Sequence, residues 1–315
     1  MPPYSILATI ALAGALAVAP AAAQEYPTRA VNMVIPFPPG GNTDLMARAL
    51  QPELAKALGQ SVVVVNKGGA GGTIGDIEVS NARPDGYTIG LTPNNPITAQ
   101  PHIQKLPYGL NSFRYVCLTY DVPYLLMAST KAPFSNFAEF VAFTKAKNDN
   151  LIYSSPGPGT QPHLGILAVL TAIKAEGVHV PFTGAGPMGQ AMQAGTVMAM
   201  AESPAVAKAN NLRVLAALSK TRIAALPDVP TMAELGYPAE AFSAGGIVVP
   251  AKTPDAVVAR LQKACADAVA SEGYKSASEK LNATARYLPE ADFKAMFEAD
   301  SVRNAETVKK FGLTQ

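Results

Sequence analysis

Short apolar strands that alternate with helices are the feature that most limits how this chain can fold. Residues 31–36 and 62–65 are rich in Val and Ile, as buried strands are. Between them Leu and Ala recur at helical spacing until Gly59 ends the pattern. We expect further strands at 87–91, 124–127, 151–154, 178–182, 197–201 and 246–249, and further helices around 74–79 and at 136–147, 164–174 and 255–270. This alternation predicts an α/β fold with parallel sheets covered by helices, and the length favours two lobes over one.

The amino terminus indicates the compartment. Residues 6–19 are almost entirely Ile, Leu, Ala and Val, and the first charged side chain is Glu25. This run is shorter than the roughly 20 apolar residues that a membrane-spanning helix needs, and small residues follow it at 21–23. We therefore predict a signal peptide over 1–23, cleaved after Ala23, and a soluble mature protein in the periplasm. The first five residues lack the usual Lys or Arg, so the true translation start stays open, and a buried helix is the alternative reading.

Composition excludes several classes of protein. Apolar residues make up 49% of the chain and charged residues 15%, which is typical of a globular protein with a sizeable core. The formal net charge is only +2 and no Lys or Arg run stands out, so neither nucleic acid nor an anionic membrane is an expected partner. Cys117 and Cys265 each lie in an apolar stretch, where an exported protein can hold either a disulfide or two buried free thiols. Both alternatives stay open, and we expect a monomer.

A glycine-rich turn joins the first strand to the first helix. It runs from Phe37 through Gly40 and Gly41 to Asn42 and Asp44. The first N–H groups of a helix have no intrahelical partner and carry partial positive charge, and glycine lets a ligand approach the backbone closely. The turn is therefore a candidate carboxylate site. The alternative is an ordinary turn in which Asn42 caps the helix and Asp44 complements its dipole.

Two more turns of this kind follow later strands. One is SSPGPGTQPH over 154–163, and the other is PFTGAGPMG over 181–189. The second contains Gly184, Gly186 and Gly189 at the spacing of a dinucleotide-binding fingerprint. We reject that interpretation because no acidic residue lies about 20 positions further on, the chain is predicted to be exported, and Pro187 suits the first turn of a helix.

The ordered set of motifs resembles one known family. These motifs are YPTRAVNMVIPFPPGGNTDLMAR (26–48), NKGGAGGTIG (66–75), PDGYTIGL (84–91), SSPGPGTQPHL (154–164), VPFTGAGP (180–187) and LPDVPTMAELG (226–236). Each is weak alone, but together and in this order they resemble the substrate-binding proteins of tripartite tricarboxylate transporters, also called the Bug family. The resemblance spans essentially the whole mature chain.

The resemblance implies a fold and a site. The fold is the hinged, two-lobed Venus-flytrap fold of type II-like periplasmic binding proteins, with lobe 1 formed by 24–122 plus 248–315 and lobe 2 by 123–247. Main-chain amides and ordered waters from both lobes would hold a carboxylate of the ligand. The residues expected to line the cleft are Phe37, Gly40, Gly41, Asn42, Thr43, Asp44, Asn94, Asn95, Gly157, Gly159, Thr160, His163, Thr183, Gly184, Ala185 and Glu202.

Two positions bear on specificity. Many members of the family carry an acidic residue where this chain has Met198, which cannot take that role. Glu202 occupies a second position that is often acidic, and we expect it either to face the ligand or to make an ordinary polar contact.

The sequence favours a binding protein over an enzyme. It contains no G-x-S-x-G or S-x-x-K motif and no cluster of residues at metal-ligand spacing, and His179 lies in an apolar strand where a structural role suits it. We therefore expect no catalytic residue, cofactor or metal. The expected partners are a small carboxylate, such as a dicarboxylate, tricarboxylate, aromatic acid or amino acid, and the membrane permease subunits of the transporter. A co-receptor for a membrane sensor kinase is the alternative function.

Overall fold

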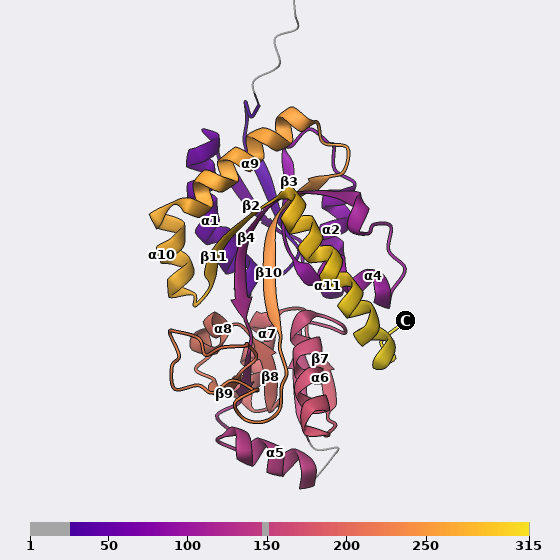
Figure 1. The fold of residues 1–315 in the computed structure, drawn as a ribbon, viewed down its shortest axis with the longest axis vertical. Helices are drawn as coiled ribbons and strands as arrows, with labels where there is room; N and C mark the ends of the chain where they lie inside the picture. The colour runs from indigo at the N-terminus through magenta and orange to yellow at the C-terminus, as the bar shows by residue number, and fades with distance from the viewer. Residues whose placement is uncertain (1–25, 147–150, 315) are drawn as a thin grey trace, which may run out of the picture.

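A computed structural model describes residues 26–146 and 151–314 of the chain. The predicted signal peptide and its cleavage site lie outside these residues. Figure 1 shows two lobes, one above the other, with the chain passing between them along extended strands. The two-lobed α/β fold expected from the sequence is confirmed.

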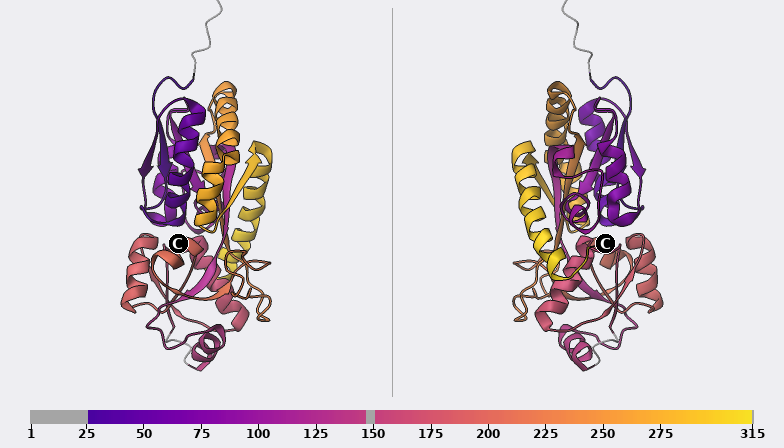
Figure 2. Two further views of the ribbon diagram at one scale, coloured as in Figure 1. Left: turned by 90° about the vertical axis from the view of Figure 1, so that its left-hand side faces the viewer. Right: turned by 90° about the vertical axis from the view of Figure 1, so that its right-hand side faces the viewer.

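The first lobe is built on a six-stranded sheet in the order β11-β4-β10-β3-β1-β2. Its strands come from both ends of the chain, and the side views in Figure 2 show the early strands and the late helices packed in the same lobe. The strands are β1 (Val31–Ile35), β2 (Val62–Asn66), β3 (Thr88–Pro93), β4 (Phe113–Pro123), β10 (Phe242–Pro250) and β11 (Thr284–Pro289). The helices are α1 (Asn42–Leu58), α2 (Thr73–Ser80), α3 (Asn94–Thr98), α4 (Gln100–Ile103), α9 (Asp255–Ala270), α10 (Glu272–Lys280) and α11 (Glu290–Lys310), with short 3-10 turns at Ala70–Gly72 and Leu110–Ser112.

The second lobe is built on a five-stranded sheet in the order β7-β6-β8-β5-β9. Its strands are β5 (Leu125–Ala128), β6 (Ile152–Ser155), β7 (Val178–Pro181), β8 (Ala199–Glu202) and β9 (Arg213–Ala217). Its helices are α5 (Phe137–Ala146), α6 (Gln161–Ile173), α7 (Ala185–Ala194) and α8 (Pro204–Ala209). Apolar clusters cover both faces of each sheet, so each lobe has its own core.

The sheets are mixed, whereas the sequence predicted parallel ones. β1 runs parallel to β2 and β3, and β6 runs parallel to β7 and β8, as strand–helix alternation requires. β10 and β5 are antiparallel to their neighbours. β5 follows directly from β4 of the first lobe, and β10 brings the chain back from the second lobe. Each of them therefore enters its sheet from the side of the other lobe, opposite to the direction of the parallel strands.

Two crossings place β4 and β10 beside each other where the lobes meet. β4 leads directly into β5 of the second lobe, and β10 brings the chain back, paired with β4 along its length. The predicted lobe boundary at 122/123 falls at the end of β4, and the one at 247/248 falls inside β10. The lobe limits therefore stay a prediction at residue level.

A disulfide joins Cys117 in β4 to Cys265 in α9, which resolves the alternatives that the sequence left open. Both residues are fully buried in the first lobe. The bond fixes the helix that covers the sheet to one of the strands that cross between the lobes.

Candidate functional site

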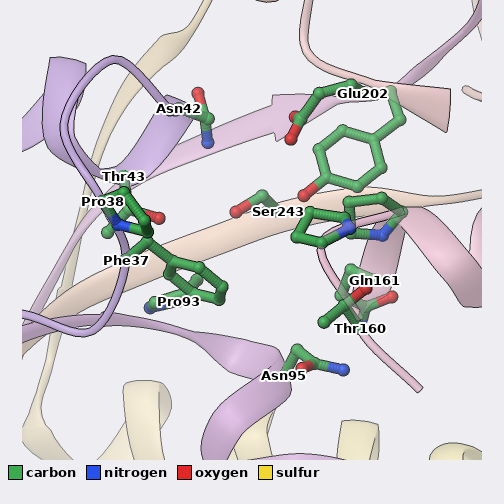
Figure 3. A pocket seen from close by; sticks show the side chains of 14 residues that line it. Phe37, Pro38, Asn42, Thr43, Pro93, Asn95, Thr160, Gln161, Glu202 and Ser243 are labelled. Carbon is green, nitrogen blue, oxygen red and sulfur yellow. The ribbon is translucent and has the colours of Figure 1, made fainter. Parts of the chain in front are cut away.

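A pocket lies between the two lobes and holds about 460 Å³ of non-protein space, including its opening. Figure 3 shows the side chains that line it. The first lobe contributes Phe37, Pro38, Gly41, Asn42 and Thr43 from the β1–α1 turn, and Pro93 and Asn95 from the end of β3 and the start of α3. The second lobe contributes Pro156, Thr160, Gln161, Pro162 and Glu202, and the crossing segments contribute Tyr124 and Ser243.

Two helices from different lobes begin at this pocket. α1 begins at Asn42 and α6 at Gln161, and neither helix start receives a hydrogen bond from a capping side chain. Among the described residues, no acceptor pairs with the N–H groups of Asn42, Thr43 and Asp44 or with those of Gln161 and His163. Asn42 is the first residue of α1 and not its cap, since Gly41 takes the cap position. Two sets of free N–H donors, each with the positive end of a helix dipole, therefore converge from the two lobes.

Polar side chains in the pocket also lack partners. Asn42 Nδ2 and Asn95 Oδ1 are buried without a hydrogen bond in the described part of the chain. The side chains of Asn42 and Asn95 are 5% and 2% exposed. Burying an unpaired polar atom costs about 1–3 kcal/mol. A polar ligand in the pocket can remove this cost by hydrogen-bonding to these atoms.

Asn95 also bonds the two lobes to each other. Its Nδ2 donates to the carbonyl oxygen of Gly159, and nearby Gln100 Nε2 donates to the carbonyl oxygen of Pro158 at 3.0 Å. Both acceptors belong to the turn that precedes α6. The lobes are therefore in direct contact at the edge of the pocket.

Glu202 ends β8 and lies in the pocket wall, only 4% exposed. Burial raises its pKa to about 7, against a hydrogen bond from the N–H of Ser203 to Oε1 at 2.7 Å. No Lys, Arg or His side chain is among the residues that line the pocket. The pocket therefore attracts an anion through main-chain donors and presents one acidic side chain of its own.

Two residues of the first predicted turn support its shape from outside the pocket. Asp44 Oδ2 accepts from the N–H of Gly40 at 3.0 Å, and its carboxylate also binds Arg48 and Asn66. Although burial opposes ionisation, these hydrogen bonds hold the pKa of Asp44 below its usual value. Gly40 has a φ of 86°, where a side chain is strained, so it forms the bend that precedes the helix.

The second predicted turn reaches the pocket in part. Thr160 lines it, whereas Gly157 lines a neighbouring cavity on the other side of Pro156. Gly159 has a φ of 67° and packs against Ile103 of the first lobe. It is therefore a lobe contact and not a lining residue.

His163 lies under the second turn and not in the pocket wall. Its Nδ1 accepts from the N–H of Gly159 at 2.9 Å, and its ring stacks on His179 with 4.0 Å between centroids. Burial first, and then the neighbouring His179, lower the pKa of His163 to about 3. His163 is therefore a neutral support for the turn, and His179, which pairs with Ser155 at 2.7 Å, has the structural role expected of it.

The third predicted turn lies beside the pocket. Thr183 lines the neighbouring cavity together with Gly157, Gly184 packs near Pro38, and Ala185 begins α7. α7 follows β7, which is an edge strand, so its start is displaced from the centre of the lobe interface.

Asn94 and Asn95 are adjacent in sequence but face different surroundings. Asn94 Nδ2 donates to Asp300 of α11 at 2.9 Å, and its Oδ1 accepts from the N–H of Ala244 at 3.4 Å. Asn94 is therefore part of the interior of the first lobe, and only Asn95 lines the pocket.

The sequence missed several lining residues. Gln161 and Pro162 lie inside a motif that was singled out and follow Thr160 directly, so the helix start itself was a usable signal. Tyr124 and Ser243 carried no local signal, because they line the pocket only where the chain crosses between the lobes. Pro38, Pro93 and Pro156 form apolar parts of the pocket wall, but in the sequence they indicate only turns.

Two α/β lobes joined by crossing strands, with an anion-attracting pocket between them, define a substrate-binding protein of the periplasmic type. The chain belongs to the family described as the tripartite tricarboxylate transporter family receptors, whose model matches residues 46–313. Members of this family are extracytoplasmic binding proteins that work with membrane transporter components, and they are not enzymes. The sequence-based family assignment is confirmed.

Individual relatives cover most of the chain. Protein BugT of Bordetella pertussis is 35% identical over 276 residues, which is 84% of each chain. The solved structure of the periplasmic binding protein BugD is 32% identical with a TM-score of 0.85, covering 92% of this chain and 99% of that chain. MatC from Rhodopseudomonas palustris, solved with bound malate, is 29% identical with a TM-score of 0.83 and covers 90% and 100%. Another R. palustris protein, solved with adipate, is 26% identical with a TM-score of 0.87 and covers 91% and 98%.

In residues 26–146 and 151–314 no helix has both the length and the apolar character needed to cross a bilayer. The same part of the chain brings together no group of three His, Cys, Asp or Glu side chains that could bind a metal ion.

Proposed function

We propose that the protein captures a small organic carboxylate in the pocket between its lobes and delivers it to the membrane subunits of a tripartite tricarboxylate-type transporter. The observation that carries the proposal is the convergence of two uncapped helix starts, those of α1 and α6, on one pocket. A carboxylate that bridges them supplies acceptors to N–H groups of both lobes.

The energetics favour an anion over a neutral ligand. An anion at a helix start gains about 0.3–1 kcal/mol, and up to about 2 kcal/mol in a partly buried position. Two such starts act on one carboxylate here, and the unpaired Asn42 Nδ2 adds a further buried donor. Phe37 and the prolines of the wall exclude water, which strengthens each of these interactions.

The ligands of structural neighbours support the same class of compound. MatC was solved with malate and another neighbour with adipate, and both ligands are carboxylates. We expect Gly41, Asn42, Thr43, Thr160 and Gln161 to make the principal contacts in this protein.

Delivery to a transporter requires export. We propose that residues 1–23 direct the chain to the periplasm and are removed after Ala23. Mass spectrometry of the protein purified from the periplasm tests this directly, since the mature chain should begin at Gln24.

Thermal unfolding against a panel of carboxylates tests the binding step. A ligand at about 100 times its Kd stabilises the folded state by about 2.7 kcal/mol. The primary amides of the same acids are the matched controls, and they should give no stabilisation because they lack the charge. Mass spectrometry of the recovered ligand should show no conversion. Equal stabilisation by acids and amides, or by none of the acids, would contradict the proposal.

Uptake by cells tests the delivery step. Cells that lack the gene should lose uptake of the acid identified by the panel, and the intact gene should restore it. Restoration by a variant that folds but does not bind the acid would show that the pocket has no part in transport.

A further inference from the structure

Glu202 is the acidic side chain of the pocket, and its position is central. β8 lies in the middle of the second sheet, between β6 and β5, and Glu202 is its last residue. Figure 3 shows the carboxylate of Glu202 and the amide of Asn42 projecting into the same space from opposite lobes. An anionic ligand held by the start of α1 therefore lies near Glu202.

The hydrogen bonds of Glu202 are incomplete. Among the described residues only Ser203 hydrogen-bonds to it, chiefly through its N–H, which donates to Oε1 at 2.7 Å. Asp44 is a buried acid of the same region and is fully paired, with Arg48, Asn66 and the N–H of Gly40. The contrast indicates that Asp44 serves the fold and that Glu202 can still accept a hydrogen bond from a ligand.

The groups that surround Glu202 do not neutralise it. β4 and the residue that follows it bring the phenols of Tyr120 and Tyr124, and both acquire raised pKa values, first through burial and also through the charge of Glu202. β10 brings the hydroxyl of Ser243, and α1 brings the amide of Asn42. Asp44 is also in the first turn of α1, but its charge is matched by Arg48. The described part of the chain places no cationic side chain in the pocket lining to offset Glu202.

We propose that Glu202 determines specificity at the far end of the ligand, selecting a carboxylate that carries an ammonium or hydroxyl donor there and disfavouring one that carries a second carboxylate. The inference rests on the proposed function, because it assumes that the helix starts hold the first carboxylate. It adds the chemical class of the ligand: an amino acid or hydroxy acid with one net anionic site facing the helices.

The physical basis is charge repulsion in a poorly screened space. Two like charges in contact across a closed pocket interact several times more strongly than they do in water. An ammonium or hydroxyl group instead donates a further hydrogen bond to the carboxylate of Glu202. We therefore expect replacement of the far-end donor by a carboxylate to weaken binding by at least about tenfold at a pH where Glu202 is ionised.

The selection should weaken as the pH falls. The pKa of Glu202 is about 7, so at about pH 6 most of the protein carries a neutral Glu202, which can donate a hydrogen bond to a second carboxylate. At about pH 8 the side chain is ionised and repels it.

Calorimetry with two matched ligand series tests the proposal. The first series is succinate, 4-aminobutyrate and 4-hydroxybutyrate, and the second is adipate, 6-aminohexanoate and 6-hydroxyhexanoate. The variant is Glu202→Gln, which keeps the shape and removes the charge. The matched control is Glu240→Gln, an exposed acid of the same lobe. At about pH 8 wild type and the control should prefer the amino or hydroxy acid by at least about tenfold, and Glu202→Gln should lose most of that preference.

The outcomes separate this inference from the proposed function. If wild type binds none of these acids and none of a wider carboxylate panel, the proposed function fails. If wild type binds acids but ranks them as Glu202→Gln does, the proposed function stands and the role of Glu202 is overturned.

A second measurement does not depend on the folding of the variant. The ratio of the Kd for 3-sulfopropanoate to that for 4-aminobutyrate should fall between about pH 8 and about pH 6 in wild type, because the sulfonate does not titrate there and Glu202 does. A constant ratio would overturn the inference as well.

Discussion

Two buried polar regions of this protein differ in whether their hydrogen bonds are complete. Under α3 and α11, Asp300 accepts from Asn94, Thr98 and Asn304 through Oδ2 and from Arg303 through Oδ1. We call these five residues the Asp300 cluster. In the pocket between the lobes, Asn42 Nδ2 and Asn95 Oδ1 have no partner among the described residues, and Glu202 is hydrogen-bonded by Ser203 alone.

The difference separates stability from binding. A buried polar group that is fully paired stabilises the conformation that pairs it, whereas an unpaired one costs free energy until something else completes it. We therefore expect changes in the Asp300 cluster to lower stability and leave ligand binding intact. Changes in the pocket should alter ligand binding and should either keep or raise stability.

The largest effect is expected from Asp300→Ala. Removal of this carboxylate leaves the buried Asn94 amide without its acceptor and takes one of two acceptors from Thr98 and from Asn304. Together the unpaired amide and the lost hydrogen bonds to a charged group should cost about 3–5 kcal/mol. Chemical denaturation should show this loss. Glu306→Ala, an exposed acid further along the same helix, should change stability by less than about 0.5 kcal/mol. A loss of affinity without a loss of stability in Asp300→Ala would erase the distinction between the two regions.

The second-largest effect should be a gain in stability, caused by Glu202→Gln. Glu202 has its pKa raised from 4.5 to about 7 by burial, so between these values the folded protein binds more protons than the unfolded chain. The contribution of Glu202 to stability therefore falls as the pH rises through this range. Glu202→Gln removes the penalty and should stabilise the ligand-free protein by about 2–3 kcal/mol at about pH 8, and much less at about pH 5.

The pH dependence of the difference between the two proteins is the readout. Asp76, whose pKa burial raises to about 8, is present in both and cancels in that comparison. If Glu202→Gln destabilises the ligand-free protein equally at both pH values, Glu202 belongs with the paired acids.

The smallest effect distinguishes two adjacent glycines. Gly41 lines the pocket with a φ of −82°, which any residue can adopt, so Gly41→Val should keep most of the stability and weaken carboxylate binding by at least about tenfold. Gly40 has a φ of 86° and open space where a Cβ would lie, so Gly40→Ala should cost about 1 kcal/mol of stability and leave affinity nearly unchanged. Calorimetry and thermal unfolding of both variants measure the two quantities. Unchanged affinity in Gly41→Val would mean that the start of α1 does not hold the ligand.

The sequence predicted those parts of the fold in which local pattern and final environment agree. The strand at 31–36, the helix that Gly59 ends and the glycine-rich start of α6 are local features, and the structure has them within a few residues of the expected bounds. The mixed character of the sheets was not predictable in this way, because β10 takes its direction from the path of the chain through the other lobe.

The same limit explains which residues of the site the sequence misplaced or missed. Asn94 and Asn95 differ by one position on a helix, which turns a side chain by about 100°. α3 has only five residues and shows no periodic signal that would say which of the two faces inward. Tyr124 and Ser243 are about 120 positions apart along the chain and meet only at the crossing between the lobes. His163 sits in the predicted motif, but at its position in the first turn of α6 the ring points beneath the loop.

The bond between Cys117 and Cys265, which are 148 positions apart, closes the chain from 117 to 265 into a covalent ring. Every strand of the second lobe lies within that ring. A protease that cuts once anywhere in the second lobe therefore opens the ring without releasing a fragment. The nicked protein should run as one species on a non-reducing gel and as two after reduction, and both halves of the pocket should stay tethered to the first lobe.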